Sequence, residues 1–272
     1  MVSIHTQVTG LPGTLVYTLR ARAEEYGRSD AILSDPQAAR WYSQLTIPEA
    51  TRQAMELAYS PVFQLGTAVR AHLYDTICGQ FLDVYPDACV VELGAGLSTR
   101  YQRLHRPGVQ WFELDLPPAI AARELVDVET ADHHFLAASM LDEVWVEQVL
   151  GTAVLPIHTL FIAEGVLFFL NPENIRQLFR LLRTHFPGAT LACDILTRQY
   201  SQKARIRFAM AHTPIQWLVA DEAELADMGV HIQQSEVVTQ YYLERWEALG
   251  FNRRHLLTAK GNVVLAVQLL PI

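Results

Sequence analysis

The feature that most constrains this chain is an apolar segment that ends in a glycine turn. The run Val90–Leu93 is followed by the turn Gly94–Gly96, and about 20 residues later a second apolar run ends at Asp115. In parallel α/β sheets this order places the glycines at the carboxyl end of one strand and the carboxylate at the end of its neighbour. A nucleoside cofactor binds at that edge. The sequence therefore predicts that Asp115 binds a ribose, with a helix N-cap before Pro117 as its alternative role.

The length of the glycine motif separates the possible cofactors. Dinucleotides usually require a third glycine, because their pyrophosphate rests on backbone N–H groups at the start of a helix. That position is Thr99 in this chain. S-adenosylmethionine carries no phosphate and needs only a shorter turn, which Glu92, Gly94, Ala95 and Gly96 provide. We therefore expect a methyl-donor site, with a nucleotide-dependent oxidoreductase and a glycine turn without ligand as the alternatives.

Composition and charge narrow the class of protein. With 272 residues, of which 50% are hydrophobic, the chain can bury a large core without disulfide bonds or metals. The net charge of −8 argues against a nucleic-acid partner, which would require a basic surface. The three scattered cysteines, with no export signal and no uninterrupted apolar run of spanning length, predict a cytoplasmic protein without a membrane partner. Nothing in the sequence indicates the oligomeric state.

The pattern of apolar residues divides the chain into a helical part and an alternating part. Residues 1–86 read as helices, one of them beginning at Pro36 and a long one through 67–82. Residues 87–272 alternate short β-branched runs with helical stretches, which is typical of βαβ units. We expect strands at 89–93, 109–114, 134–138, 158–164, 190–195, 232–238 and 263–269, the last as an antiparallel edge strand. The predicted fold is one α/β domain with a doubly wound, mainly parallel seven-stranded sheet and a helical insertion around 197–230.

Several segments, taken in order, carry a family resemblance. They are Arg22–Glu24, Ile32–Pro36, Val69–Ala71 with Asp75, Val90–Arg100, Glu113–Pro117, Ala163–Leu167, and Ile215–Trp217 with Asp221–Leu225. Together they resemble the leucine carboxyl methyltransferase and tetracenomycin-type O-methyltransferase family over most of the chain. The resemblance implies a Rossmann-like, class I methyltransferase that uses S-adenosylmethionine and binds its acceptor with a helical insertion.

Two charged residues are expected to hold the methionine end of the cofactor. Arg70 has the planar guanidinium that suits a bidentate contact with a carboxylate. Glu164 lies inside the apolar run 160–169, where the ammonium of the cofactor would offset the cost of burying a carboxylate. The family resemblance implies the same roles. The alternatives are an exposed helix arginine for Arg70 and a structural ion pair for Glu164.

The adenine end is expected to lie against Ser139 and Met140, beyond the third strand. The family has an acidic residue there, so this chain departs from the pattern. A serine hydroxyl can still bond the edge of the base, and a thioether can pack on its face. The complete set of expected cofactor-binding residues is Arg70, Glu92, Gly94, Ala95, Gly96, Asp115, Leu116, Ser139, Met140 and Glu164.

The expected reaction is methyl transfer to a carboxylate or phenolic oxygen of a small molecule, such as a polyketide-like compound. Because an in-line displacement depends chiefly on holding the acceptor close and aligned, the sequence identifies no catalytic residue. A carboxylate is already ionised at neutral pH, whereas a phenol would gain from a general base. Candidate acceptor-binding residues are Tyr200, His212, Tyr241 and Tyr242, with Lys203, Arg205 and Arg207 as cations near an anionic oxygen. Ordinary packing and a solvated helix face are their alternative roles.

Two further points bound the function. The pair His133-His134 lacks the helical spacing and the cysteine or aspartate partners of a metal site, so no metal is expected. A catalytically idle protein that binds S-adenosylmethionine without transferring its methyl group stays open beside the methyltransferase and the oxidoreductase.

Overall fold

The computed structural model of the chain describes residues 13–47, 49, 52, 53, 56, 59–151, 158–210 and 213–272. Within these residues seven strands form one sheet, in the order β3-β2-β1-β4-β5-β7-β6. The strands are β1 (Cys89–Leu93), β2 (Gln110–Asp115), β3 (His133–Ala137), β4 (Thr159–Ala163), β5 (Thr190–Leu196), β6 (Val230–Val237) and β7 (Asn262–Leu269). The pairs among β1 to β5 are parallel, whereas β7 is antiparallel to both of its neighbours. The doubly wound sheet expected from the sequence is confirmed, and each strand begins and ends within two residues of its expected bounds.

One detail of the topology differs from expectation. Strand β7 is antiparallel, as expected, but it lies between β5 and β6, so the expectation that it forms the edge was wrong. The burial pattern gives the physical reason. Residues Val263–Val267 of β7 are all buried, whereas half-buried and exposed side chains alternate along β6 between its two buried end residues. An apolar strand suits the interior of a sheet, and a half-polar strand suits its edge.

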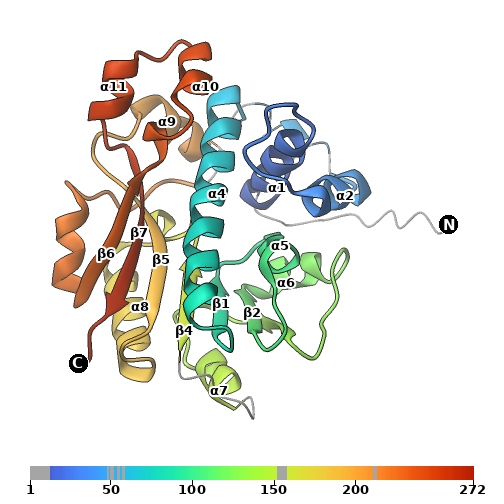
Figure 1. Cartoon of the computed structure of the whole chain (residues 1–272), viewed down its shortest axis with the longest axis vertical. Coiled ribbons are helices and arrows are strands. Elements are labelled where there is room, and N and C mark those ends of the chain that lie inside the picture. The colour runs from blue at the N-terminus through green and yellow to red at the C-terminus, as the bar shows by residue number, and fades with distance from the viewer. Residues whose placement is uncertain are drawn as a thin grey trace.

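Helices cover both faces of the sheet, and α4 runs along it (Figure 1). The helices are α1 (Gly13–Tyr26), α2 (Pro36–Gln44), α4 (Pro61–Val84), α5 (Arg100–Leu104), α6 (Pro117–Arg123), α7 (Val144–Leu150), α8 (Pro172–His185), α9 (Gln202–Met210), α10 (Leu243–Ala248) and α11 (Arg253–Thr258). The 3-10 turns are η1 (Leu167–Phe169), η2 (Glu222–Met228) and η3 (Val238–Gln240). In the sequence, helix α9 and turn η2 lie between β5 and β6, where the helical insertion is expected. None of the described helices is long and apolar enough to cross a membrane.

Local sequence explains where two of the helices begin. Helix α2 starts at Pro36, as expected, and the side chain of Asp35 caps it by accepting a hydrogen bond from the backbone N–H of Ala38 at 2.9 Å. Helix α4 starts at Pro61 in the same way, with Ser60 as its cap. A proline at the first helical position costs nothing, because that N–H has no partner within the helix.

The core consists of two layers, one on each face of the sheet. Alternate residues of a strand point to opposite faces, so Val91 of β1 packs in the layer beneath α7 and α8, while Val90 packs in the layer beneath α4. The side chains of strand β4 alternate in the same way, with Phe161 in the layer beneath α7 and α8 and Leu160 in the layer beneath α4. Burial on both faces leaves the strand ends as the places where polar side chains gather.

Candidate functional site

Two hollows lie at opposite ends of the sheet, one at the carboxyl ends of the strands and one at their amino ends. A cleft of about 400 Å³ lies at the carboxyl ends of β1, β2 and β4, within the range of about 300–1,000 Å³ found for small-molecule sites. Strand β1 lies between β2 and β4, so the strand order reverses there. Ligands of doubly wound sheets bind at such a switch point. The cleft is lined by Leu15, Thr18, Arg22, Arg70, Glu92–Ser98, Arg100, Arg103, Leu114–Leu116, Ala138–Leu141, Ile162, Glu164–Val166, Phe169, Leu170 and Thr213.

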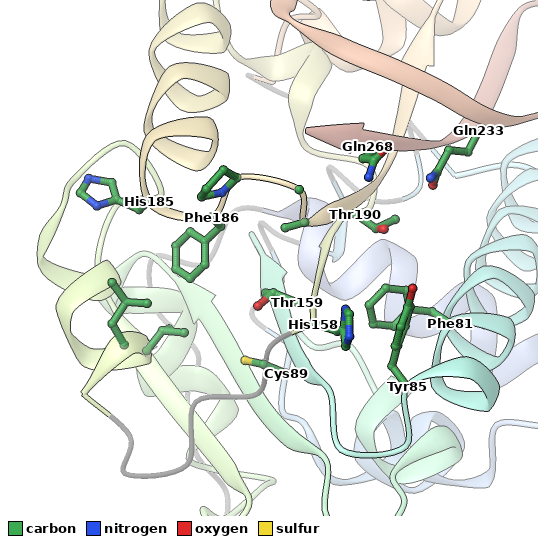
Figure 2. A pocket seen from close by; sticks show the side chains of 15 residues that line it. Phe81, Tyr85, Cys89, His158, Thr159, His185, Phe186, Thr190, Gln233 and Gln268 are labelled. Atoms are coloured by element: carbon green, nitrogen blue, oxygen red, sulfur yellow. The ribbon is translucent and has the colours of Figure 1, made fainter. Parts of the chain in front are cut away.

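The second hollow, of about 490 Å³, lies at the amino ends of β1, β4 and β5. Figure 2 shows Tyr85 and His158 on one side of it and His185 with Phe186 on the other. The rings of Tyr85 and His158 are stacked, with centroids 3.8 Å apart. None of the described residues that line this hollow is an aspartate, glutamate, lysine or arginine. The charged groups that a zwitterionic ligand requires are therefore found in the first cleft.

The glycine turn of the cleft has a backbone that favours glycine. Gly94 and Gly96 have φ angles of +69° and +53°. A Cβ atom on Gly94 would lie 2.9 Å from Cγ2 of Val166 and 3.3 Å from Cε of Met140. The backbone N–H groups of Gly94 and Ala95 donate to the carbonyl oxygen of Leu114, which holds the turn against β2. The turn is thus a cradle that a side chain would fill.

Asp115 lies at the end of β2, facing this turn. Its Oδ2 accepts a hydrogen bond from the N–H of Gly96, and its Oδ1 accepts one from the N–H of Leu116, both at 2.7 Å. Burial raises the pKa of Asp115 above its usual range, against the lowering effect of these two donors. The cap position of α6 is Leu116, so the alternative role of Asp115 as that helix cap was wrong. Each carboxylate oxygen keeps a further lone pair with which to accept a hydrogen bond from a ligand hydroxyl.

Arg70 and Glu164, which the sequence predicts to hold one ligand from two sides, contact each other. Nε of Arg70 donates to Oε1 of Glu164 at 3.1 Å, and Arg100 donates to Oε2. Burial would raise the pKa of Glu164, but Arg100 and Arg70 outweigh it and lower that pKa to about 2. The ion pair named as the alternative for Glu164 therefore exists. It does not exclude a ligand, since a carboxylate and a guanidinium have more bonding sites than one pair uses.

Arg100 links three carboxylates around the cleft and is itself 1% exposed. It donates to Glu92 at 2.6 Å, to Asp75 at 2.9 Å and to Glu164. Its burial without these partners would cost several kcal/mol. Sequence reasoning assigned no role to Arg100, although it ends the glycine segment and Asp75 lies in a family-like segment. Arg22, Arg103 and Asp35 extend the same network and were also missed.

The chain also turns sharply after β3, beside the cleft. The N–H of Asp142 donates to the carbonyl oxygen of Ser139 at 3.0 Å, and the Ser139 hydroxyl accepts from the N–H of Leu141 at 3.2 Å. Ser139 and Met140 both line the cleft, and Leu116, which is 54% exposed, lies at its rim. The cofactor residues expected from the sequence are therefore brought together around one cavity.

The residues expected to bind the acceptor lie in different places. Tyr200 packs against Gly261, and burial raises its pKa to about 12, with Arg70 and Asp194 close enough to act on its charge. Tyr241 donates to Glu236, and Tyr242 lies edge-on to His72 with ring centroids 5.7 Å apart. None of these three tyrosines lines the cleft. His212 and the side chain of Arg207 lie outside the described residues, and the side chains of Lys203 and Arg205 are exposed.

The two neighbouring histidines at the start of β3 contact polar side chains of β2. Nε2 of His133 lies 3.2 Å from Glu113, and Nε2 of His134 lies 3.1 Å from Gln110. Across the described part of the chain, no three histidine, cysteine, aspartate or glutamate side chains form a group that could hold a metal ion.

The chain as a whole is similar to proteins of known family. Residues 13–183 match the family model of leucine carboxyl methyltransferases. The chain is 28% identical over 194 residues to the tetracenomycin polyketide synthesis O-methyltransferase of Streptomyces glaucescens, covering 69% of this chain and 67% of that protein. It is 27% identical over 188 residues to an S-adenosyl-L-methionine-dependent methyltransferase of Gibberella zeae, covering 66% of this chain and 62% of that one. This chain thus spans about two thirds of the length of these relatives.

Solved structures resemble the fold as a whole. A DUF574 family protein from Streptomyces avermitilis aligns with a TM-score of 0.58 and 15% identity, over 93% of this chain and 97% of that one. A protein of Thermobifida fusca aligns with the same TM-score and 12% identity, over 97% of this chain and 100% of that one. At such identities the likeness extends to the fold alone.

Proposed function

The chain belongs to the leucine carboxyl methyltransferase family and is an S-adenosylmethionine-dependent methyltransferase, and we propose that it methylates a carboxylate or phenolic oxygen of a planar small molecule. The observation that carries the proposal is the lining of the cleft. The same cleft is lined by the glycine turn, by the ion pair of Arg70 and Glu164, and by Phe169 and Thr213. A cofactor bound by the glycine turn and the ion pair would present its methyl group to an acceptor that binds against Phe169.

In this proposal the cleft residues divide by the part of the cofactor that they bind. Asp115 accepts hydrogen bonds from the ribose hydroxyls, and Ser139 and Met140 border the adenine. Arg70 binds the carboxylate of the methionine end, and Glu164 binds its ammonium. The bound cofactor supplies a methyl group on a cationic sulfur. The glycine cradle described above fits such a ligand, because a Cβ there would occupy the space between Val166 and Met140.

An aromatic side chain of the cleft supports the proposal of a planar acceptor. Phe169 lines the cleft, and from it a series of rings runs through Phe208 and Phe63 to Tyr17. The centroids of successive rings are 5.8, 6.3 and 6.4 Å apart. The rings come from η1, α9, α4 and α1, so helices of the N-terminal part and of the insertion meet there. Of these four rings Phe169 lines the cleft, where it offers a planar ligand apolar contact area, and the other three pack in series behind it.

The proposed chemistry is positioning. Well-oriented reactants gain about 7 kcal/mol or more from proximity, so an acceptor that is already ionised needs no further catalyst. Carboxylates meet that condition at neutral pH, whereas phenols, with a pKa near 10, require a base. No histidine or lysine is present among the described residues that line the cleft. The pH dependence of transfer therefore distinguishes the two oxygens: a flat profile above about pH 6 supports a carboxylate.

The alternatives make different predictions. A dinucleotide needs the position of Thr99 for its pyrophosphate, yet Thr99 is buried and its hydroxyl donates to Asp35 at 2.6 Å. NADH should therefore not bind. An idle binding protein would bind S-adenosylhomocysteine and transfer no methyl group to any acceptor.

The test combines binding and transfer. S-adenosylhomocysteine at a hundredfold excess over its Kd should add about 2.7 kcal/mol to the free energy of unfolding, which a thermal scan detects. Radiolabelled S-adenosylmethionine is then offered with aromatic carboxylic acids, polyphenols, amines and thiols. Transfer to the oxygen compounds is expected. Transfer only to nitrogen or sulfur would contradict the proposed acceptor, and no thermal shift at millimolar ligand would contradict the proposed cofactor site.

A further inference from the structure

Near the carboxyl end of β5 lies a buried carboxylate, Asp194, to which the sequence analysis assigned no role. It is 0% exposed and does not line the cleft. Three neutral groups donate to it: the hydroxyl of Tyr74 at 2.9 Å, the N–H of Gly165 at 2.6 Å and Nδ2 of Asn262 at 3.1 Å. These donors come from α4, from the loop after β4 and from β7, so Asp194 connects three elements.

The charge of Asp194 is balanced by the arginine of the cleft. Nη1 of Arg70 lies 3.6 Å from Oδ2 of Asp194, and this is the one ion pair that Asp194 forms with a described residue. Burial alone would lower the pKa of Arg70, but Asp194 and Glu164 more than offset burial and raise that pKa. Without Arg70, Asp194 would be an uncompensated buried charge, and such charges are strongly destabilising.

The geometry fixes the guanidinium of Arg70 from two sides. Glu164 holds its Nε at 3.1 Å, and Asp194 faces its Nη1. The third nitrogen, Nη2, lies over Gly165, where a Cβ atom would be only 2.8 Å away. Asp194 also binds the N–H of that same glycine. One carboxylate therefore holds both the guanidinium and the backbone on which it rests, while Nη2 makes no hydrogen bond to a described residue.

We propose that Asp194 is a positioning residue, which orients Arg70 so that the guanidinium can bind the carboxylate of the methionine end of the cofactor. The inference rests on the proposed function, in which Arg70 has that role. It deepens that function, because the affinity for the amino-acid end of the cofactor then depends on a residue outside the cleft. The base and ribose of the cofactor are held elsewhere, at Ser139 and Asp115, so their binding should not depend on Asp194.

The test compares two ligands and two residues by calorimetry. S-adenosylhomocysteine carries the amino-acid end, and adenosine lacks it. Asp194→Asn should weaken S-adenosylhomocysteine about tenfold and leave adenosine within about twofold. Arg70→Ala should also weaken S-adenosylhomocysteine alone, and Asp194→Asn added to Arg70→Ala should have no further effect. Such non-additivity is the signature of two residues that act as a unit.

Glu113→Gln is the matched control. Glu113 is also a fully buried carboxylate on a strand, with an arginine, Arg123, at 3.3 Å, but neither residue lines the cleft. Its substitution should lower the free energy of unfolding without changing the ratio of the two ligand affinities. Tyr74→Phe is a second test that does not remove a charge: it deletes one donor to Asp194 and should produce a smaller loss, again confined to S-adenosylhomocysteine.

The outcomes separate this inference from the proposed function. Equal loss of both ligands in Asp194→Asn, or additive losses in the double variant, would show that Asp194 only supports the fold. If Arg70→Ala weakens S-adenosylhomocysteine and both Asp194→Asn and Tyr74→Phe leave it unchanged, the inference fails and the role of Arg70 stands. If Arg70→Ala itself changes neither ligand, the proposed role of Arg70 fails and the inference fails with it.

Discussion

Replacing Gly94 with alanine tests whether the glycine turn is required by backbone geometry and by the space of the cleft. The φ angle of Gly94 is +69°, in the left-handed region, where a residue with a Cβ costs about 1–2 kcal/mol. The new Cβ would also lie 2.9 Å from Cγ2 of Val166. Valine is stiff about χ1, so it cannot swing aside as a longer side chain would.

The two effects have separate magnitudes. Overpacking in a well-packed region costs about 1–3 kcal/mol, so the free energy of unfolding should fall by about 2–5 kcal/mol in Gly94→Ala. The same Cβ enters the cleft between Val166 and Met140, so the affinity for S-adenosylhomocysteine should fall about tenfold or more. Adding Val166→Ala should recover the overpacking part and leave the backbone part.

The control is Gly188→Ala, at the opposite end of the sheet. Gly188 has a φ angle of +85°, and a Cβ there would meet nothing within 4 Å. It should lose about 1–2 kcal/mol and bind S-adenosylhomocysteine normally. Urea unfolding followed by circular dichroism, with calorimetry for the ligand, measures both quantities. If Gly94→Ala costs no more than Gly188→Ala and keeps its affinity, or if Val166→Ala restores nothing, the steric reasoning is refuted.

Three further predictions concern single side chains. The pKa of Glu164 is lowered to about 2 in the folded protein, so the stabilising effect of its charge should be complete above about pH 5 and disappear as the pH falls towards 2. The difference in unfolding free energy between wild type and Glu164→Gln should therefore shrink over that range. A difference that grows would contradict the assigned ion pairs. Asp115→Ala should weaken S-adenosylhomocysteine by about 1–3 kcal/mol in calorimetry, and an unchanged Kd would remove Asp115 from the ribose site. Tyr200 lies outside the cleft lining but close enough to Arg70 for the two charges to interact, so Tyr200→Phe should raise the KM for the acceptor without changing the Kd of S-adenosylhomocysteine, whereas Tyr242→Phe, beside His72, should change neither. Steady-state kinetics with both variants measures this, and an unchanged KM in Tyr200→Phe would remove Tyr200 from the acceptor site.

The sequence predicted those parts of the structure that depend on neighbouring residues in the chain. The strand beginning at Cys89 and the helix beginning at Pro36 follow from local periodicity and from capping residues, and both were found at the expected places. The glycine turn and Asp115 lie close together because adjacent parallel strands end at the same edge of the sheet. The order of β6 and β7 differed from expectation, although the continuous apolar run of β7 and the half-polar pattern of β6 favour the order that was found.

The partners of the charged residues were harder to predict, since an ion pair joins segments that are far apart in sequence. Glu164 was recognised because an isolated carboxylate in an apolar run needs a cation, but the sequence could not tell a ligand ammonium from Arg100 or Arg70. The same argument applies to Asp194, which interrupts the apolar strand β5, and it would have identified that residue before the structure did. A buried acid in a strand therefore predicts that a cation is present, and only the fold identifies it. Where that cation also lines a cleft, as Arg70 does, the buried acid becomes part of the site without touching the ligand.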